Sequence, residues 1–192
     1  MKKLALLGAA LVAGLFFAGA ARAEGGMTLV LQMFGEGTTI GTLDQVAAEQ
    51  GIDLGNRDLG FAYSEFQCHT MPLIDPATKL QLGSGIDCLA NIQKDGNGGL
   101  TLTAVSFFVL PSGTLVSAGQ TSLPAFINSF GDASGSDNAR THVTGAIPSG
   151  NNVIAGTGQF AGMTGKVRLS GTMRIGDTLF FDCIFVLDLE SA

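Results

Sequence analysis

The C-terminal part of the chain alternates apolar and polar side chains with a period of two, over two consecutive segments. The apolar positions of the first segment, 166–175, are Val167, Leu169, Gly171, Met173 and Ile175. In the second segment, 179–189, they are Leu179, Phe181, Cys183, Phe185, Leu187 and Leu189. Because successive side chains of a strand point to opposite faces, this pattern predicts two β-strands, each with one face in a core. It also places Cys183 among core residues, which favours an inert thiol over a reactive one.

Similar patterns recur through most of the chain, separated by turns rich in Gly, Pro, Asn and Asp. We expect further strands near residues 29–34, 60–70, 79–92, 100–110, 114–119 and 152–155. One short helix is expected at 43–50, with Thr42 as its N-cap and Gly51 just past its end. About eight consecutive antiparallel strands predict an all-β fold closed into a single barrel, because closure removes exposed sheet edges. A β-sandwich is the alternative.

The first 23 residues have the parts of a cleavable secretory signal. Lys2 and Lys3 precede an uncharged stretch, and a small-residue cleavage site ends at Ala23. The uncharged stretch, 4–20, has 17 residues, fewer than the roughly 20 of a transmembrane helix. We therefore expect residues 1–23 to be removed on the general secretory route. Residues 24–192 should form one domain in the periplasm or outside the cell, without membrane attachment.

The charge balance excludes nucleic acid as a partner. The whole chain has 10 Lys and Arg residues against 16 Asp and Glu residues, a net charge of −6. Removal of the leader takes away Lys2, Lys3 and Arg22, so the net charge becomes −9. An acidic surface repels phosphate backbones and anionic lipid surfaces.

Three cysteines remain after the leader: Cys68, Cys88 and Cys183. An oxidising compartment lets a disulfide persist, and three cysteines allow one disulfide and one thiol. We expect the pair Cys68–Cys88, because both residues lie on consecutive predicted strands around one turn. Three buried reduced thiols are the alternative.

Segment 100–110 is apolar on both faces, with Leu102 and Phe108 on one and Val105 and Phe107 on the other. Such a strand is covered on its second face either by a loop of the same chain or by another subunit. The sequence therefore leaves a homo-oligomer open as one of two explanations.

A glycine-rich run precedes the first alternating segment: Gly156-Thr157-Gly158-Gln159-Phe160-Ala161-Gly162-Met163-Thr164-Gly165. It resembles the Gly-Thr-Gly-x-Phe/Tyr-x-Gly-x-x-Gly stretch of the allene oxide cyclase and dirigent β-barrel superfamily, which has bacterial exported members. A looser similarity extends over residues 55–189. The resemblance implies a cofactor-free barrel with an apolar cavity, whose shape holds a bound molecule in a reactive conformation for cyclisation or coupling. It carries over no catalytic residue.

The physical role of this run can be argued without the family. Gly156, Gly158, Gly162 and Gly165 permit a tight turn into a strand, and Phe160 is placed to plug the base of a barrel. Phosphate binding is the rival interpretation. Phosphate-binding glycine loops open a helix, however, whereas a strand follows here.

Candidate ligand-binding residues come from the expected strand at 60–70. Tyr63, Glu65 and His69 share one face of that strand, and with Phe181 they would line a cavity if that face points inward. The other face, with Phe66 and Cys68, is as good a core face, which would leave the polar stripe in solvent. No zinc-like spacing of His and Cys and no Gly-x-Ser-x-Gly elbow is present, so we expect no metal and no cofactor.

Two functions follow as hypotheses. The first is a barrel that binds an apolar small molecule in its cavity, with cyclisation or isomerisation as its chemistry. The second is a non-catalytic exported protein that acts through its surface. A barrel interior filled by Leu169, Met173, Phe181 and Phe185 would favour the second.

Overall fold

The structure is a computed structural model that describes residues 22–23, 26–94, 99–123, 140–145, 152–174 and 177–191. This part of the chain is mostly β-structure with one α-helix, α1 (Leu43–Glu49). The strands are β1 (Arg22–Ala23), β2 (Gly26–Glu36), β3 (Thr38–Thr42), β4 (Gln67–Ile74), β5 (Gln81–Lys94), β6 (Leu100–Leu110), β7 (Gly113–Leu123), β8 (Arg140–Gly145), β9 (Asn152–Gly156), β10 (Met163–Arg174) and β11 (Phe180–Ser191). Two short 3-10 helices are η1 (Tyr63–Glu65) and η2 (Gly158–Phe160).

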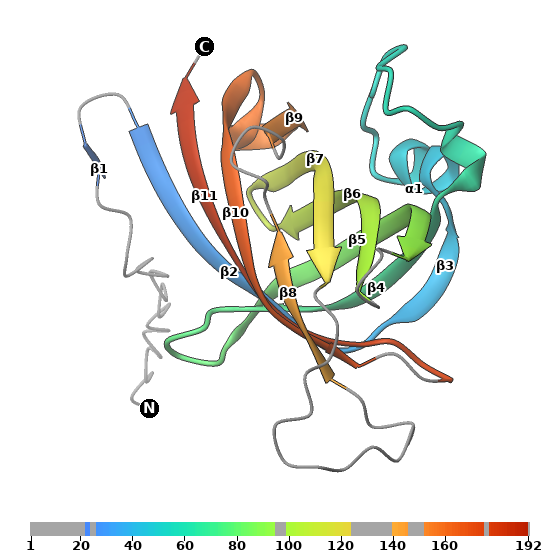
Figure 1. Ribbon diagram of the computed structural model, residues 1–192. Helices are drawn as coiled ribbons and strands as arrows, with labels where there is room; N and C mark the ends of the chain where they lie inside the picture. The colour runs from blue at the N-terminus through green and yellow to red at the C-terminus, as the bar shows by residue number, and fades with distance from the viewer. Residues whose placement is uncertain are drawn as a thin grey trace, which may run out of the picture.

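The strands form one antiparallel sheet whose pairing returns to its first long strand (Figure 1). From β2 the order runs through β11, β10, β7, β6 and β5 to β4, and β4 pairs with β2 again. Between β10 and β7 lie both β8 and β9, each of which pairs with both neighbours. The predicted all-β fold of a single antiparallel sheet is confirmed, and its hydrogen bonding forms a ring.

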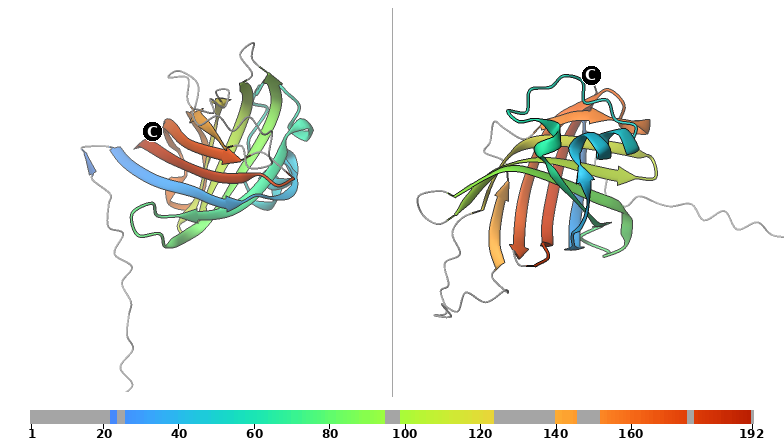
Figure 2. Two further views of the ribbon diagram at one scale, coloured as in Figure 1. Left: turned by 60° about the horizontal axis from the view of Figure 1, so that its bottom comes forward. Right: turned by 90° about the vertical axis from the view of Figure 1, so that its right-hand side faces the viewer.

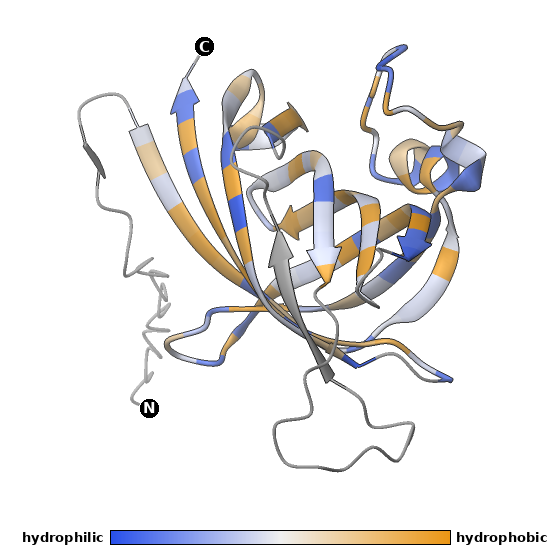
Figure 3. Cartoon of the chain, in the orientation of Figure 1, coloured by the Kyte–Doolittle hydropathy of each residue, from blue (hydrophilic) through white to orange (hydrophobic). Residues whose placement is uncertain are grey.

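The predicted apolar faces of β10 and β11 point into this ring. Buried side chains of these two strands join residues of the other strands in one apolar cluster. Those from β10 and β11 are Val167, Leu169, Met173, Phe181, Cys183, Phe185, Leu187 and Leu189. The rings of Phe108 and Phe185 meet edge to face inside it, with centroids 5.0 Å apart. Figure 3 shows the alternation as bands along β2, β10 and β11.

A second apolar cluster lies on the outside of β4, β5, β6 and β7. There, α1 and the segment at 50–66 cover the sheet, and they bury Val105 and Phe107 of β6 (Figure 2, right). The apolar second face of β6 is thus covered by the chain itself, so it no longer motivates a homo-oligomer. The helix begins at Leu43 with Thr42 as its N-cap, as expected, and the Thr42 backbone N–H donates to Gln45 Oε1 at 3.0 Å.

The strand expected at 60–70 begins only at Gln67. The preceding residues belong to the outer cover, because local hydrogen bonds hold them in turns. The Tyr63 hydroxyl donates to the carbonyl oxygens of Gly55 and Arg57 at 3.2 and 3.1 Å. Neither contact is visible in a pattern of hydrophobicity.

The ring closes through a short seam between β2 and β4, in which Gln32 pairs with Ile74 and Met33 with Leu73. On the outside of the seam, Gln32 donates to Asp182 Oδ1 at 2.6 Å and accepts from Lys79 Nζ at 3.1 Å. Gln32 thereby links β11, β2 and the turn between β4 and β5.

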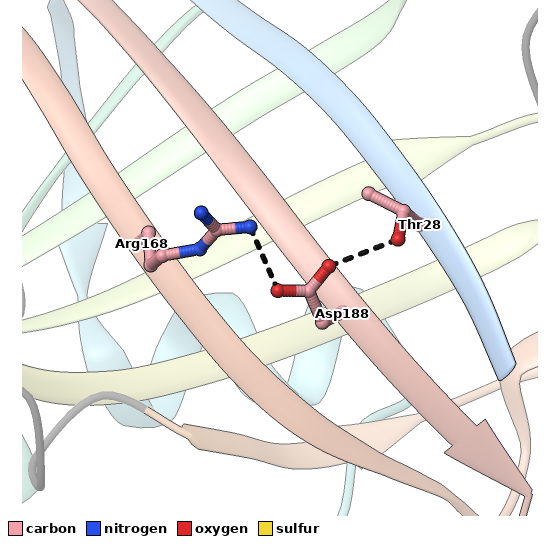
Figure 4. Close-up of polar contacts among 3 residues, drawn as sticks. All are labelled: Thr28, Arg168 and Asp188. Atoms are coloured by element: carbon pink, nitrogen blue, oxygen red, sulfur yellow. Dashed lines mark hydrogen bonds and ion pairs between the residues drawn. The ribbon is translucent and has the colours of Figure 1, made fainter.

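Further along the same outer face, a carboxylate joins three strands. Asp188 of β11 accepts from Thr28 of β2 at 2.9 Å and from Arg168 of β10 at 2.8 Å (Figure 4). Arg168 and Asp188 are both well exposed, so this ion pair adds little to stability.

The predicted disulfide is present. Cys68 of β4 and Cys88 of β5 are a cross-strand pair, and their sulfurs are bonded. They lie in the outer cluster, beneath α1 and segment 50–66. The third thiol, Cys183, is free and buried. A disulfide is compatible with an oxidising, exported compartment.

The leader lies almost wholly outside the described residues. Only Arg22 and Ala23 are described, as a short strand paired with β2, so cleavage after Ala23 stays a prediction. Within the described ranges, no helix has the length and apolar character to span a membrane.

The glycine-rich run docks against the turn before β7. Gln159 N–H donates to the Ser112 carbonyl at 2.9 Å, and Thr157 N–H donates to the Thr114 carbonyl at 2.8 Å. Gly158 has a φ of 58°, and a Cβ there would collide with the Ser112 carbonyl oxygen. A Cβ on Gly156 would strike the backbone of Phe160. Gly162 and Gly165 follow at the start of β10, and Phe160 is fully buried in the inner cluster.

Phe160→Ala should lower the free energy of unfolding by about 3–5 kcal/mol, because it removes a large side chain from a packed interior. The matched control is Phe34→Ala on the outer face of β2, where the residue is 41% exposed and the loss should be about 1 kcal/mol or less. Urea denaturation followed by circular dichroism measures both. Equal losses of unfolding free energy in the two variants would contradict a role of Phe160 in packing the interior of the ring.

Replacing both bridged cysteines, Cys68→Ala with Cys88→Ala, should cost about 3 kcal/mol of stability, because the bond closes a loop with a sequence separation of 20. Dithiothreitol should destabilise the wild type by a similar amount and leave this variant unchanged. Cys183→Ala is the control and should respond to dithiothreitol as the wild type does. A reductant effect in the double variant would show that the bond is not its origin.

Candidate functional site

A row of polar side chains crosses the inner wall of the ring at one level. His69 of β4 pairs with Asp87 of β5, Asp87 with Ser106 of β6, and Ser106 with Ser117 of β7. All four residues are buried. Their neighbours along each strand belong to the inner apolar cluster, among them Met71, Leu89 and Phe108. The row is therefore a polar band next to the inner apolar cluster.

Asp87 is the charged group of this row, and it is only 6% exposed. The Ser106 hydroxyl donates to its Oδ1 at 2.7 Å. Burial raises the pKa of Asp87 to about 6, and the hydrogen bond from Ser106 offsets part of that effect. Near neutrality this carboxyl exchanges its proton readily, as a general acid or base must.

His69 continues the row toward the surface. Its Nδ1 lies 3.3 Å from the hydroxyl oxygen of Thr39, an exposed residue of β3. Its ring lies beside Phe181, with centroids 6.4 Å apart. Burial lowers the pKa of His69, which favours the neutral imidazole.

Cys183 of β11 points into the same interior. Burial, and next the charge of Asp87, raise the pKa of its thiol to about 12. The Sγ lies 3.8 Å from the Thr172 carbonyl oxygen, to which it donates. A thiol held protonated in this way is a poor nucleophile, as the sequence pattern indicated.

Two inward hydroxyls of β7, one in the row and one four residues further along the strand, have no hydrogen-bond partner among the described residues. They are Ser117 Oγ, in a residue with no exposed surface, and Thr121 Oγ1, in a residue that is 4% exposed. Thr121 lies on the same strand and points inward with Leu123. A buried hydroxyl without a partner costs about 1–3 kcal/mol, so a native fold seldom keeps two of them on one strand.

The structure separates the four candidate ligand-binding residues into two groups. His69 and Phe181 lie together inside the ring. Tyr63 and Glu65 lie in η1, outside it, so the expectation that they share a strand face with His69 is wrong. Tyr63 instead braces the outer cover, and Glu65 is exposed.

Sequence reasoning missed Asp87, Ser106 and Ser117. Asp87 carried a signal, because it is a charged residue flanked by Ile86 and Cys88 within an expected strand. The serines carried none, since small hydroxyls are common on either face of a strand. Only the register of four strands brings them together. In the described residues, no three His, Cys, Asp or Glu side chains are grouped to hold a metal ion.

Asp87→Asn should stabilise the protein increasingly as the pH rises from 4 to 7. Because the folded pKa of about 6 exceeds the unfolded 3.8, the protonated carboxyl contributes stability below about pH 4. This contribution is lost as the pH passes through the folded value. Asparagine stays neutral, so the gain over the wild type should approach about 3 kcal/mol at pH 7.

Urea denaturation at several pH values measures this difference, with the exposed Asp177→Asn as the control. The titration of His69 is common to all three proteins and cancels in the comparison. If the stability gain of Asp87→Asn does not change between pH 4 and pH 7, the raised pKa of the buried Asp87 carboxyl is contradicted.

Comparison with known proteins assigns neither a family nor a function to the chain. No family model, no curated protein and no solved structure matches the chain. The resemblance to allene oxide cyclase and dirigent barrels therefore depends on the run from Gly156 to Gly165, and it stays a prediction.

Proposed function

We propose that the ring is a closed β-barrel whose interior binds a small, mainly apolar molecule with one polar group held against the row at Asp87. The protein would be exported, with its leader removed after Ala23, and would need no cofactor. Apolar walls with a few convergent polar groups are the usual composition of a small-molecule site.

The observation that carries this proposal is the buried carboxyl of Asp87 in one row with Ser117, whose hydroxyl has no hydrogen-bond partner among the described residues. A second such hydroxyl, that of Thr121, lies further along β7. In a ring that serves only as a scaffold, alanine or valine at these positions would pack equally well and cost nothing in desolvation. A ligand hydroxyl or carbonyl group would supply the partner that the described residues do not.

Proton transfer is the chemistry that the row supports. Protonated Asp87 would donate to a ligand oxygen, and its carboxylate would accept a proton from carbon or oxygen, with neutral His69 as a second base along the row. An isomerisation or cyclisation of an unsaturated molecule needs no more than this. The family resemblance leads to the same class of reaction.

A second candidate function, action through the outer surface, has an observation of its own. Leu169, Met173, Phe181 and Phe185 are all buried in the inner cluster and fill much of the ring. At the same time, Val30, Phe34 and Ile184 leave apolar surface exposed on β2 and β11. A ligand screen separates the two candidates.

A panel of unsaturated fatty acids and phenolic compounds tests the first candidate by thermal denaturation. A molecule that binds only the native state raises the midpoint. The shift should be reduced in Asp87→Asn and retained in Ser64→Ala, an exposed serine of η1. If no compound shifts the wild type, interior binding is refuted and the surface role is favoured.

Thr121→Val should raise the stability of the free protein by about 1 kcal/mol and weaken ligand binding at the same time. The first effect follows from removing an unpartnered buried hydroxyl, the second from removing a group that the ligand would contact. Thr101→Val on β6 is the matched control, because its hydroxyl is exposed. Urea denaturation and the thermal shift measure the two effects. A loss of stability in Thr121→Val would show that the hydroxyl is satisfied in the free protein.

A further inference from the structure

A hollow of about 510 Å³ lies outside the ring, where the outer cover meets the sheet. Residues 57–61 of the cover form one wall. The other wall consists of outward-facing residues of β6, β7 and β9: Thr103, Ala118, Gln120, Asn152 and Ile154. The hollow is therefore separated from the polar row by the thickness of the sheet.

The pairing register of β6, β7 and β9 determines which side chains form the sheet wall of this hollow. Thr103 pairs with Gln120, and Ala118 pairs with Asn152, so these side chains share one face of three adjacent strands. Thr103 is 8% exposed, and its side chain lines the hollow.

The opposite wall is held in place before any ligand arrives. The Tyr63 hydroxyl donates to the carbonyl oxygens of Gly55 and Arg57, and Gly60 N–H donates to Asp58 Oδ1 at 2.8 Å. Phe61 and Leu59 pack against the outer apolar cluster. A wall fixed in this way loses little conformational entropy on binding.

The side chains around the hollow offer hydrogen bonds without a net charge. Arg57 and Asp58 cancel each other, while Gln120 and Asn152 both donate and accept. Phe61 and Ile154 add apolar surface. A molecule that matches this lining is neutral, carries many hydroxyls and has an apolar face, which describes a sugar ring.

The surface that could contact a ligand extends beyond the first hollow. Asn152 also borders a second hollow of about 380 Å³, which reaches Thr164, Lys166, Asp188 and Glu190 on β10 and β11. We propose that the outer face of β6, β7 and β9 binds a short neutral oligosaccharide, seated under residues 57–61 and extended past Asn152. This site is independent of the function proposed for the interior.

The chain has one tyrosine and no tryptophan, so the intrinsic fluorescence of Tyr63 reports on the wall of this site. Cellotriose, maltotriose and chitotriose would be titrated into the full protein, with fluorescence and calorimetry as readouts. At least one should give a saturable change. Thr103→Val and Gln120→Ala should each weaken that binding about tenfold, the effect of one lost hydrogen bond.

Gln81→Ala, which removes an exposed amide at the first residue of β5, away from Thr103, is the control and should bind as the wild type does. Unchanged unfolding midpoints show that the variants are folded. The absence of saturable binding by all three trisaccharides overturns the proposal. So does binding that Thr103→Val and Gln120→Ala leave intact. Arg57-dependent binding of benzoate with no binding of the sugars would make the hollow an anion site, which also overturns it.

Discussion

Burial of apolar side chains on both faces of β4, β5, β6 and β7 is the constraint on which the rest of the structure depends. Their inward residues fill the ring, and their outward residues hold α1, segment 50–66 and the disulfide. The four strands thus form a wall that is shared by the inner and the outer apolar cluster. The polar row lies on its inner side, and the outer hollow lies where the cover stops. The positions of both candidate sites therefore depend on how far each apolar cluster extends along these strands.

The polar side chains of the inner core are concentrated at one level. His69, Asp87, Ser106 and Ser117 form a continuous band across four strands, and Thr121 lies further along β7. Scattered polar residues would suggest tolerance of random substitution. A band in register, with a carboxyl at its centre, instead resembles the arrangement of groups that hold one molecule in one orientation.

Local patterns predicted the parts of this fold that local forces decide. The alternation in β10 and β11, the capped helix after Thr42 and the Cys68–Cys88 bridge all follow from short-range chemistry. Segment 50–66 could not be predicted, because its shape depends on tertiary packing and on a hydroxyl that reaches back to two carbonyl oxygens. The polar row was hidden for another reason. Which of Asp87 or Cys88 points inward depends on the register of neighbouring strands, and hydrophobicity alone leaves that choice open.

The pairing of β2 with β11 has a consequence for how the chain assembles. Thr28 and Asp188 are hydrogen-bonded across 160 residues of sequence, whereas only a few residues of sequence separate each of β4, β5, β6 and β7 from the next. Contacts between distant segments form slowly, since a long loop has to close first. During synthesis β2 leaves the ribosome long before β11 exists. The central meander can therefore collapse under its helix early, while the first long strand waits for the last one to complete the wall.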